Sequence, residues 1–212
     1  MLAATVSLAL PQPSRAQANA AAATTAAGKL VLVVGDSLSA EYGLTRGSGW
    51  VALLEARLAQ KKITARVVNA SISGDTTSGG RSRLPQLLRL HRPAVVVLEL
   101  GGNDALRGLP LNTSRDNLAQ MARSAKAAGA KVLVLGMQVP PNYGRQYSDQ
   151  FFAVFGNVAK AEGTALVPFM LKGVADGPRA GEMFQPDRIH PKAAAHPLIL
   201  DNVWPALEPL LR

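Results

Sequence analysis

Four short clusters of small and polar residues contain the side chains that acyl transfer requires. The first is Gly35-Asp36-Ser37-Leu38, the second is Ser71-Ile72-Ser73-Gly74-Asp75, the third is Gly101-Gly102-Asn103-Asp104, and the fourth is Asp187-Arg188-Ile189-His190. Acyl transfer needs a nucleophile, a general base, a group that orients the base, and hydrogen-bond donors for the developing oxyanion. Each cluster alone is compatible with an ordinary turn, but together they supply all of these groups.

The spacing of the clusters suggests a Ser-His-Asp triad. Ser37 lies where the chain is expected to turn sharply off a strand, and it is the candidate nucleophile. His190 is the candidate base. Asp187 precedes it by three residues, so one helical turn would place both side chains on the same face. Asp187 would then hold the imidazole in the required tautomer and stabilise its cationic form.

The remaining clusters offer donors for an oxyanion hole. We expect these donors to be the backbone N–H groups of Ser37 and Gly74 and the side-chain amide of Asn103. Glycine suits the second position because it has no Cβ to block the approach of a substrate. Asp36 and Asp104 are expected to support their own loops by accepting backbone N–H bonds.

The other two histidines have no carboxylate partner at a useful spacing. His91 lies at the end of a predicted helix, where it would interact with the last carbonyl groups. His196 precedes Pro197 and has no acidic residue three or four positions before it, which predicts a surface position. Of the three histidines, only His190 is therefore a candidate catalytic group.

Strands and helices alternate along the chain and would position these clusters. The predicted strands span residues 30–34, 66–69, 94–100, 131–137 and 165–167. Helices are predicted around Trp50 to Leu58, over 83–90, over 114–128 with Ser114 as N-cap, around Phe151 to Val158, and from about Leu198. This alternation predicts a three-layer α/β/α sandwich with a parallel sheet. In such sheets ligands bind beyond the carboxyl ends of the strands, where the first three clusters begin.

Composition limits the alternatives. The 212 residues are 48% hydrophobic and 17% charged, which predicts one globular domain, assigned here to residues 28–212. The chain has no cysteine, which excludes disulfides and thiolate metal sites, and no cluster has metal-ligand spacing. The net charge is +9, but the basic residues are scattered and aromatic residues make up only 5%, so we do not expect nucleic-acid binding. No apolar run approaches the roughly 20 residues of a membrane span.

Residues 1–27 are interpreted as a signal-peptide-like, Ala-rich N-terminal segment. Residues 1–10 are mostly apolar, and Ala16-Gln17-Ala18 has the small-x-small form of a signal-peptidase site. No Lys or Arg precedes the apolar run, so the charged part of a signal peptide is missing. The segment predicts export to the periplasm or the medium.

The four clusters, in this order, resemble the blocks of the SGNH (GDSL) hydrolases. The similarity is greatest to the periplasmic multifunctional acyl-CoA thioesterase I/lysophospholipase L1/arylesterase group, through residues 68–76, 99–104 and Pro140-Pro141-Asn142-Tyr143-Gly144. The resemblance implies a flavodoxin-like, five-stranded parallel sheet and a shallow site without metal or cofactor. It also implies esters or thioesters of fatty acids and aryl alcohols as substrates. We expect a monomer that acts on small acyl esters or thioesters, with lysophospholipids as further candidate substrates.

We therefore expect hydrolysis of esters and thioesters through an acyl-Ser37 intermediate, with Leu109 and Tyr143 lining an acyl groove. The shared motifs leave open a deacetylase of glycans or small esters. A catalytically idle lipid- or glycan-binding protein is the alternative from another class, although a pure binder has no need of Ser37, Asp187 and His190 together.

Overall fold

The predicted strands pair into one sheet. The computed structural model describes residues 28–212, except for the side chain of Pro141, and the signal-like segment expected over residues 1–27 lies outside them. The strands are β1 (Lys29–Gly35), β2 (Ala65–Asn69), β3 (Val95–Glu99), β4 (Lys131–Leu135) and β5 (Ala165–Val167). Their order is β2-β1-β3-β4-β5, and every neighbouring pair is parallel. This flavodoxin-like order confirms the predicted fold class.

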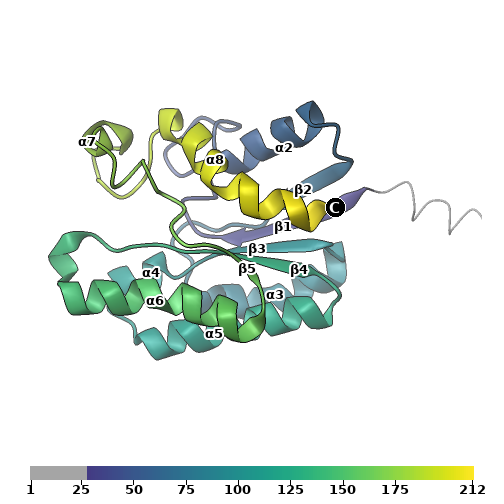
Figure 1. The fold of residues 1–212 in the computed structure, drawn as a ribbon, viewed down its shortest axis with the longest axis horizontal. Coiled ribbons are helices and arrows are strands. Elements are labelled where there is room, and N and C mark those ends of the chain that lie inside the picture. Colours follow the sequence, from purple (N-terminus) through teal and green to yellow (C-terminus); the bar gives the residue numbers. More distant parts are fainter. Residues whose placement is uncertain (1–27) are drawn as a thin grey trace, which may run out of the picture.

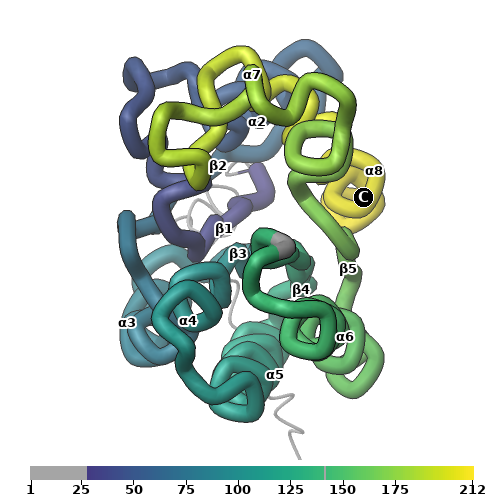
Figure 2. Tube along the Cα trace, turned by 90° about the vertical axis from the view of Figure 1, so that its left-hand side faces the viewer, coloured from purple at the N-terminus to yellow at the C-terminus, as the bar shows by residue number. Residues whose placement is uncertain are grey.

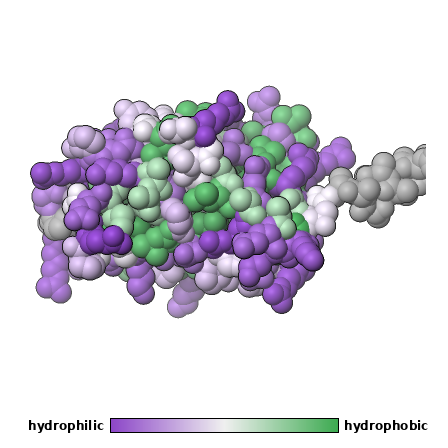
Figure 3. Space-filling view, turned by 90° about the horizontal axis from the view of Figure 1, so that it is seen from above, coloured by the Kyte–Doolittle hydropathy of each residue, from purple (hydrophilic) through white to green (hydrophobic). Residues whose placement is uncertain are grey.

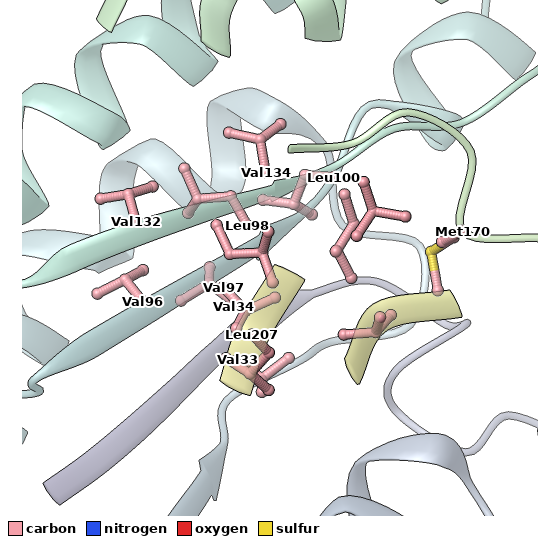
Figure 4. Packing of buried hydrophobic residues seen from close by; sticks show 14 of the residues in the cluster. Val33, Val34, Val96, Val97, Leu98, Leu100, Val132, Val134, Met170 and Leu207 are labelled. Carbon is pink, nitrogen blue, oxygen red and sulfur yellow. The ribbon is translucent and has the colours of Figure 1, made fainter. Parts of the chain in front are cut away.

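The central strands are continuous apolar runs because both of their faces are buried. The side chains of β1 from Leu30 to Val34 and of β3 from Val95 to Leu98 are almost completely inaccessible to solvent. Figure 4 shows this packing, in which Leu207 from the C-terminal helix lies close to Val33 and Val34 of β1. The core therefore fixes the positions at which the strands end.

Helices cover both faces of the sheet. They are α2 (Trp50–Gln60), α3 (Thr77–His91), α4 (Gly102–Leu106), α5 (Leu111–Ala127), α6 (Arg145–Glu162), α7 (Ala180–Met183) and α8 (His196–Leu207), with 3₁₀ turns η1 (Pro141–Tyr143), η2 (Ala193–Ala195) and η3 (Glu208–Leu211). Figure 1 shows α2 and α8 on one face and α3, α5 and α6 on the other, which gives the three layers.

Two helices begin earlier than the sequence pattern indicates. Helix α3 starts at Thr77 instead of residue 83, with the Thr76 hydroxyl accepting the Gly79 N–H at 3.3 Å as an N-cap. Glycine disfavours helices, so Gly80 argues against a helical first turn in the sequence. In the structure glycine is needed there, because a Cβ at this position would lie 2.2 Å from the Leu100 side chain. Helix α5 starts at Leu111, so the prediction of Ser114 as its N-cap is wrong. The short helices α4 and α7 were not predicted.

The outer side of the α2–α8 layer carries hydrophobic areas surrounded by hydrophilic side chains (Figure 3). There the guanidinium of Arg57 lies 5.7 Å from the centre of the Trp204 ring and pairs with Asp201 at 2.7 Å. These contacts tie α2 to α8 across the surface. None of the helices formed by residues 28–212 combines the length and the apolar character that a membrane span requires.

The prediction of a surface position for His196 is wrong. Its side chain is 1% exposed, and its Nδ1 accepts the N–H of Trp50, the first residue of α2, at 2.9 Å. Gly49, the N-cap residue, has no side chain, so the imidazole satisfies a donor that would otherwise be unpaired at the start of the helix. Burial lowers the pKa of His196, while the Pro191 carbonyl and the Glu41 carboxylate act in the opposite direction.

This arrangement predicts a stability loss at acidic pH. Because the pKa of His196 is lower in the folded than in the unfolded chain, its contribution is complete above about pH 6.5 and is lost as the pH falls. Between pH 8 and pH 5, Tm should therefore fall more for the wild type than for His196→Gln. His91→Gln, at the end of α3, serves as control and should follow the wild type. Equal losses in all three proteins would contradict the role assigned to His196.

Candidate active site

The four polar clusters meet at one end of the molecule. Figure 2 looks onto the carboxyl ends of the strands, where α4, α7 and the start of α6 surround the loops that follow β1 and β2. In the 2-1-3-4-5 order, β1 is the strand from which the chain proceeds to both sides, and ligand sites form at this point of doubly wound sheets. The loop after β1 contains Ser37.

The turn that carries Ser37 is fixed by hydrogen bonds from its neighbours. The carboxylate of Asp36 accepts the N–H of Leu38 at 3.0 Å, and the Asp36 carbonyl accepts the N–H of Ala40 at 2.9 Å. The N–H of Asp36 itself donates to the Glu99 side chain at 3.2 Å. The expectation that Asp36 supports its own loop is therefore confirmed, and Ser37 leaves the sheet in a defined direction.

The structure brings together the three predicted triad residues. His190 Nε2 lies 2.9 Å from Ser37 Oγ, and His190 Nδ1 lies 2.7 Å from Asp187 Oδ2. Distances of this size allow the imidazole to accept the Ser37 proton while its other nitrogen donates to the carboxylate. The hydroxyl, the imidazole and the carboxylate form one continuous hydrogen-bonded chain.

The spacing of Asp187 and His190 suggested one turn of a helix, but in the structure these residues do not lie on a helix. They flank a tight turn in which Asp187 Oδ1 accepts the N–H groups of Ile189 at 2.9 Å and of His190 at 3.0 Å, and Arg188 has a φ of 58°. Partial burial raises the pKa of Asp187, but hydrogen bonds from the backbone of His190 and Ile189 and from the imidazole lower it to about 2. Asp187 is therefore ionised at neutral pH and can stabilise a protonated imidazole.

Tyr42 and Gln185, which the sequence did not single out, support the segment that carries His190. The Tyr42 ring lies against His190 with the ring centres 4.3 Å apart. Gln185 reaches across from the His190 segment, and its side-chain amide donates to the carbonyl of Tyr42 at 2.9 Å and to that of Pro191 at 3.2 Å. A tyrosine or glutamine in a loop carries no signal of such a role in the sequence.

The predicted oxyanion donors converge on the same loops. Within residues 28–212, the N–H groups of Ser37 and Gly74 donate no hydrogen bond. The side-chain amide of Asn103 donates one hydrogen to Asp36 Oδ2 at 3.1 Å, which orients the amide and leaves its second hydrogen for another acceptor. Gly74 has a φ of 79°, a conformation that favours glycine.

Beneath the Ser37 turn lie two buried carboxyl groups, Asp36 and Glu99. Burial raises the pKa of Asp36 to about 6, although hydrogen bonds from Leu38 and Asn103 oppose this. Burial and the neighbouring Asp36 raise the pKa of Glu99 well above its usual range. The second effect arises because two adjacent buried carboxylates repel each other, which favours the neutral form of Glu99. The sequence analysis did not single out Glu99, although a glutamate at the end of an apolar strand indicates a buried carboxyl group with a structural or functional role.

Asp104 supports its neighbours and not its own loop. Its buried carboxylate accepts the Thr77 N–H at 2.9 Å, the Ser114 hydroxyl at 3.1 Å and the Thr77 hydroxyl. The expected bonds to its own loop are replaced by bonds to residues that begin α3 and lie in the first turn of α5. Asp104 thus joins three helices directly behind Asn103.

Leu109 and Tyr143, the predicted groove residues, lie on segments at the same end of the sheet. Leu109 follows α4 and is 36% exposed. The Tyr143 ring stacks on Tyr147 with the centres 6.0 Å apart, and the Tyr147 hydroxyl donates to the Ala105 carbonyl at 3.4 Å, which connects this region to α4. Tyr143 and Tyr147 also line an open hollow of about 430 Å³. No group of three or more His, Cys, Asp or Glu side chains suited to a metal ion occurs within residues 28–212.

Comparison with known proteins agrees with this geometry. Residues 33–198 match the family described as "GDSL-like Lipase/Acylhydrolase family". The chain belongs to this family. The matched region includes all four polar clusters, so the resemblance inferred from them is confirmed.

Several named proteins are similar to this chain over most of their length. The chain is 58% identical over 186 residues to "Esterase TesA" of Pseudomonas aeruginosa, covering 88% of this chain and 91% of that protein. It is 41% identical to "Thioesterase 1/protease 1/lysophospholipase L1" of Escherichia coli strain K12, covering 88% and 86%. A solved structure titled "Crystal Structure of TesA" superimposes with a TM-score of 0.83 at 56% identity, covering 86% of this chain and 99% of that one.

The contacts of Asp104 predict a large stability effect. Asp104→Ala leaves the Thr77 N–H and two hydroxyl groups without their acceptor in a buried region, so the free energy of unfolding should fall by roughly 3 kcal/mol or more. Urea denaturation measures this change. The control Asp116→Ala, in an exposed pair with Arg115, should stay within about 0.5 kcal/mol of the wild type. A similarly small change for Asp104→Ala would contradict the role assigned to its buried carboxylate.

Proposed function

We propose that this protein is a serine hydrolase that cleaves carboxylic esters and thioesters through an acyl-Ser37 intermediate. The observation that carries the proposal is the hydrogen-bonded series from Ser37 Oγ through His190 to Asp187, at 2.9 and 2.7 Å. Family membership and the similarity to a named esterase and a named thioesterase/lysophospholipase support it. No cofactor takes part in the proposed reaction.

The first half of the reaction acylates Ser37. His190 Nε2 accepts the hydroxyl proton while Ser37 Oγ attacks the carbonyl carbon, and Asp187 stabilises the resulting imidazolium. The N–H groups of Ser37 and Gly74 and the Asn103 amide donate to the oxyanion of the tetrahedral intermediate. When this intermediate collapses, the bond to the leaving alcohol or thiol breaks, and His190 returns the proton to the leaving group.

The second half releases the acid. Water takes the place of the leaving group, loses a proton to His190 and attacks the acyl carbon, so a second tetrahedral intermediate forms in the same oxyanion hole. Its collapse returns the proton to Ser37 Oγ and frees the carboxylic acid. Asp187 remains ionised throughout, in keeping with its low pKa.

The proposed substrates are acyl esters and thioesters, including lysophospholipids, with an apolar acyl chain lying along Leu109 and Tyr143. Leu109 is exposed and Tyr143 is half-buried, and two further exposed apolar side chains, Tyr42 and Ile189, belong to residues that contact the triad. Burial of such surface against a substrate chain stabilises the complex by about 25 cal/mol per Å².

We further propose that the mature protein is a monomer exported from the cytoplasm. The apolar residues 1–10 and the Ala16-Gln17-Ala18 pattern support export. The proposed domain boundary near residue 28 follows from the same composition change.

The experiment that tests the function is hydrolysis of p-nitrophenyl esters from acetyl to long acyl chains. Wild type should turn over these esters, and Ser37→Ala should lose at least about 10³-fold in kcat, because a triad without its nucleophile retains only binding and oxyanion stabilisation. Ser39→Ala, a variant of a buried serine in the same turn, controls for damage to the fold, and its residual activity should far exceed that of Ser37→Ala.

The acyl-chain profile separates the alternatives. A preference for longer chains agrees with the lipid-type esterase proposed here, whereas turnover of acetyl esters alone would indicate a deacetylase. Absence of turnover for every ester and thioester would contradict the proposal and favour a binding protein.

A further inference from the structure

The N–H of Gly74 is one of the proposed oxyanion donors, and Gly74 lies in a β-turn. The Asp75 N–H donates to the Ile72 carbonyl at 3.0 Å, so Ser73 and Gly74 are the central residues of a β-turn. Gly74 has a positive φ and Ser73 does not, which is the pattern of a type II turn. Glycine permits several orientations of the adjoining peptides, so the turn alone does not fix the direction of the Gly74 N–H.

The base of this turn is firmly held. The Ile72 N–H donates to the Gly35 carbonyl at 3.0 Å, which ties the turn to the end of β1. Asp75 pairs with Arg83 at 2.8 Å, and Arg83 also donates to the carbonyls of Gly35 and Ala70. These contacts lie on both sides of Gly74 but none involves Gly74 itself.

Arg107 makes the contact that reaches Gly74. Its Nη2 donates to the Gly74 carbonyl at 2.8 Å, and no other donor to this carbonyl occurs within residues 28–212. The same nitrogen would lie 3.5 Å from a Cβ at Gly74, so the guanidinium packs directly over the turn. Arg107 is exposed, and its planar group with several fixed donors suits a directional contact of this kind.

Arg107 and Asn103 approach the turn from the same short helix. Arg107 follows α4 by one residue, and its N–H donates to the Asn103 carbonyl at 3.2 Å. Residues four positions apart lie on the same helix face, so α4 presents the Asn103 amide and the Arg107 guanidinium together. One element thus controls both donors that come from outside the Ser37 turn.

We propose that Arg107 is a positioning residue that holds the Gly74 turn so that its N–H donates to the oxyanion. The inference rests on the proposed function, because an oxyanion forms only if Ser37 attacks a carbonyl group. Arg107 does not touch the reacting atoms. It acts through Gly74, and its effect belongs to the transition state and not to substrate binding.

The test compares Arg107→Met and Arg107→Lys with the wild type on p-nitrophenyl butyrate. Arg107→Met should lower kcat by about tenfold or more and leave KM within about twofold, since complete loss of one oxyanion donor costs ~10²–10³-fold in kcat. Arg107→Lys should recover part of the loss, because an ammonium group can still donate to the Gly74 carbonyl. Tm should change little in either variant because Arg107 is exposed.

A second measurement is independent of ester turnover. Covalent inactivation by a p-nitrophenyl phosphonate forms a tetrahedral adduct whose oxygen occupies the oxyanion hole, so its rate should fall in Arg107→Met in parallel with kcat. Arg115→Met, which removes an exposed arginine that pairs with Asp116 on α5, is the matched control and should behave as wild type.

The possible failures are distinguishable. Wild-type kcat and inactivation rate in Arg107→Met would overturn the inference and leave the proposed function intact. A rise in KM without a fall in kcat would make Arg107 a substrate-binding residue, and a fall in kcat with a matching fall in Tm would make it a structural one; both would overturn it. An inactive wild type would overturn the proposed function and this inference with it.

Discussion

Parallel pairing of the strands is the constraint on which the rest of the structure depends. All five strands end at the same edge of the sheet, so residues separated by more than 150 positions, such as Ser37 and His190, meet there within 2.9 Å. The apolar side chains of β1 and β3 leave these strands little freedom to slide, because a shift in register would break the close packing of their side chains on both faces of the sheet. The position of the Ser37 turn relative to Asn103 is therefore set by the core, far from any substrate.

Buried carboxyl groups transmit this rigidity from the core to the site. Glu99 receives the N–H of Asp36 and the Ser39 hydroxyl, Asp36 orients the Asn103 amide, and Asp104 joins α4 to α3 and α5. Each group accepts hydrogen bonds from residues far away in sequence, and such bonds in a region of low dielectric are costly to leave unmade. Two kinds of ionisable group therefore lie near Ser37. His190 and Asp187 belong to the proposed triad, whereas the buried carboxyl groups hold the loops.

The sequence was sufficient for the strands, because hydrophobic runs are local signals. The sheet order and the meeting of Ser37, Asp187 and His190 were expected from the family resemblance and from the four polar clusters taken together. It failed where a long-range contact decides the outcome. His196 was expected at the surface because no acidic residue precedes it, yet its partner is the Trp50 N–H, 146 residues away. The early start of α3 depends on Gly80 packing against Leu100, and the contacts of Tyr42, Glu99 and Arg107 likewise require the folded chain.

This assembly should make Ser37, and no other residue, a covalent nucleophile. Treatment of the wild-type protein with an organophosphate that carries a p-nitrophenol leaving group, followed by intact-mass measurement and peptide mapping, tests it most directly. We expect one phosphoryl group per chain, located on Ser37 and absent from His190→Ala, in which the hydroxyl has lost its base. An unlabelled wild type, or a label on any other residue, would contradict it.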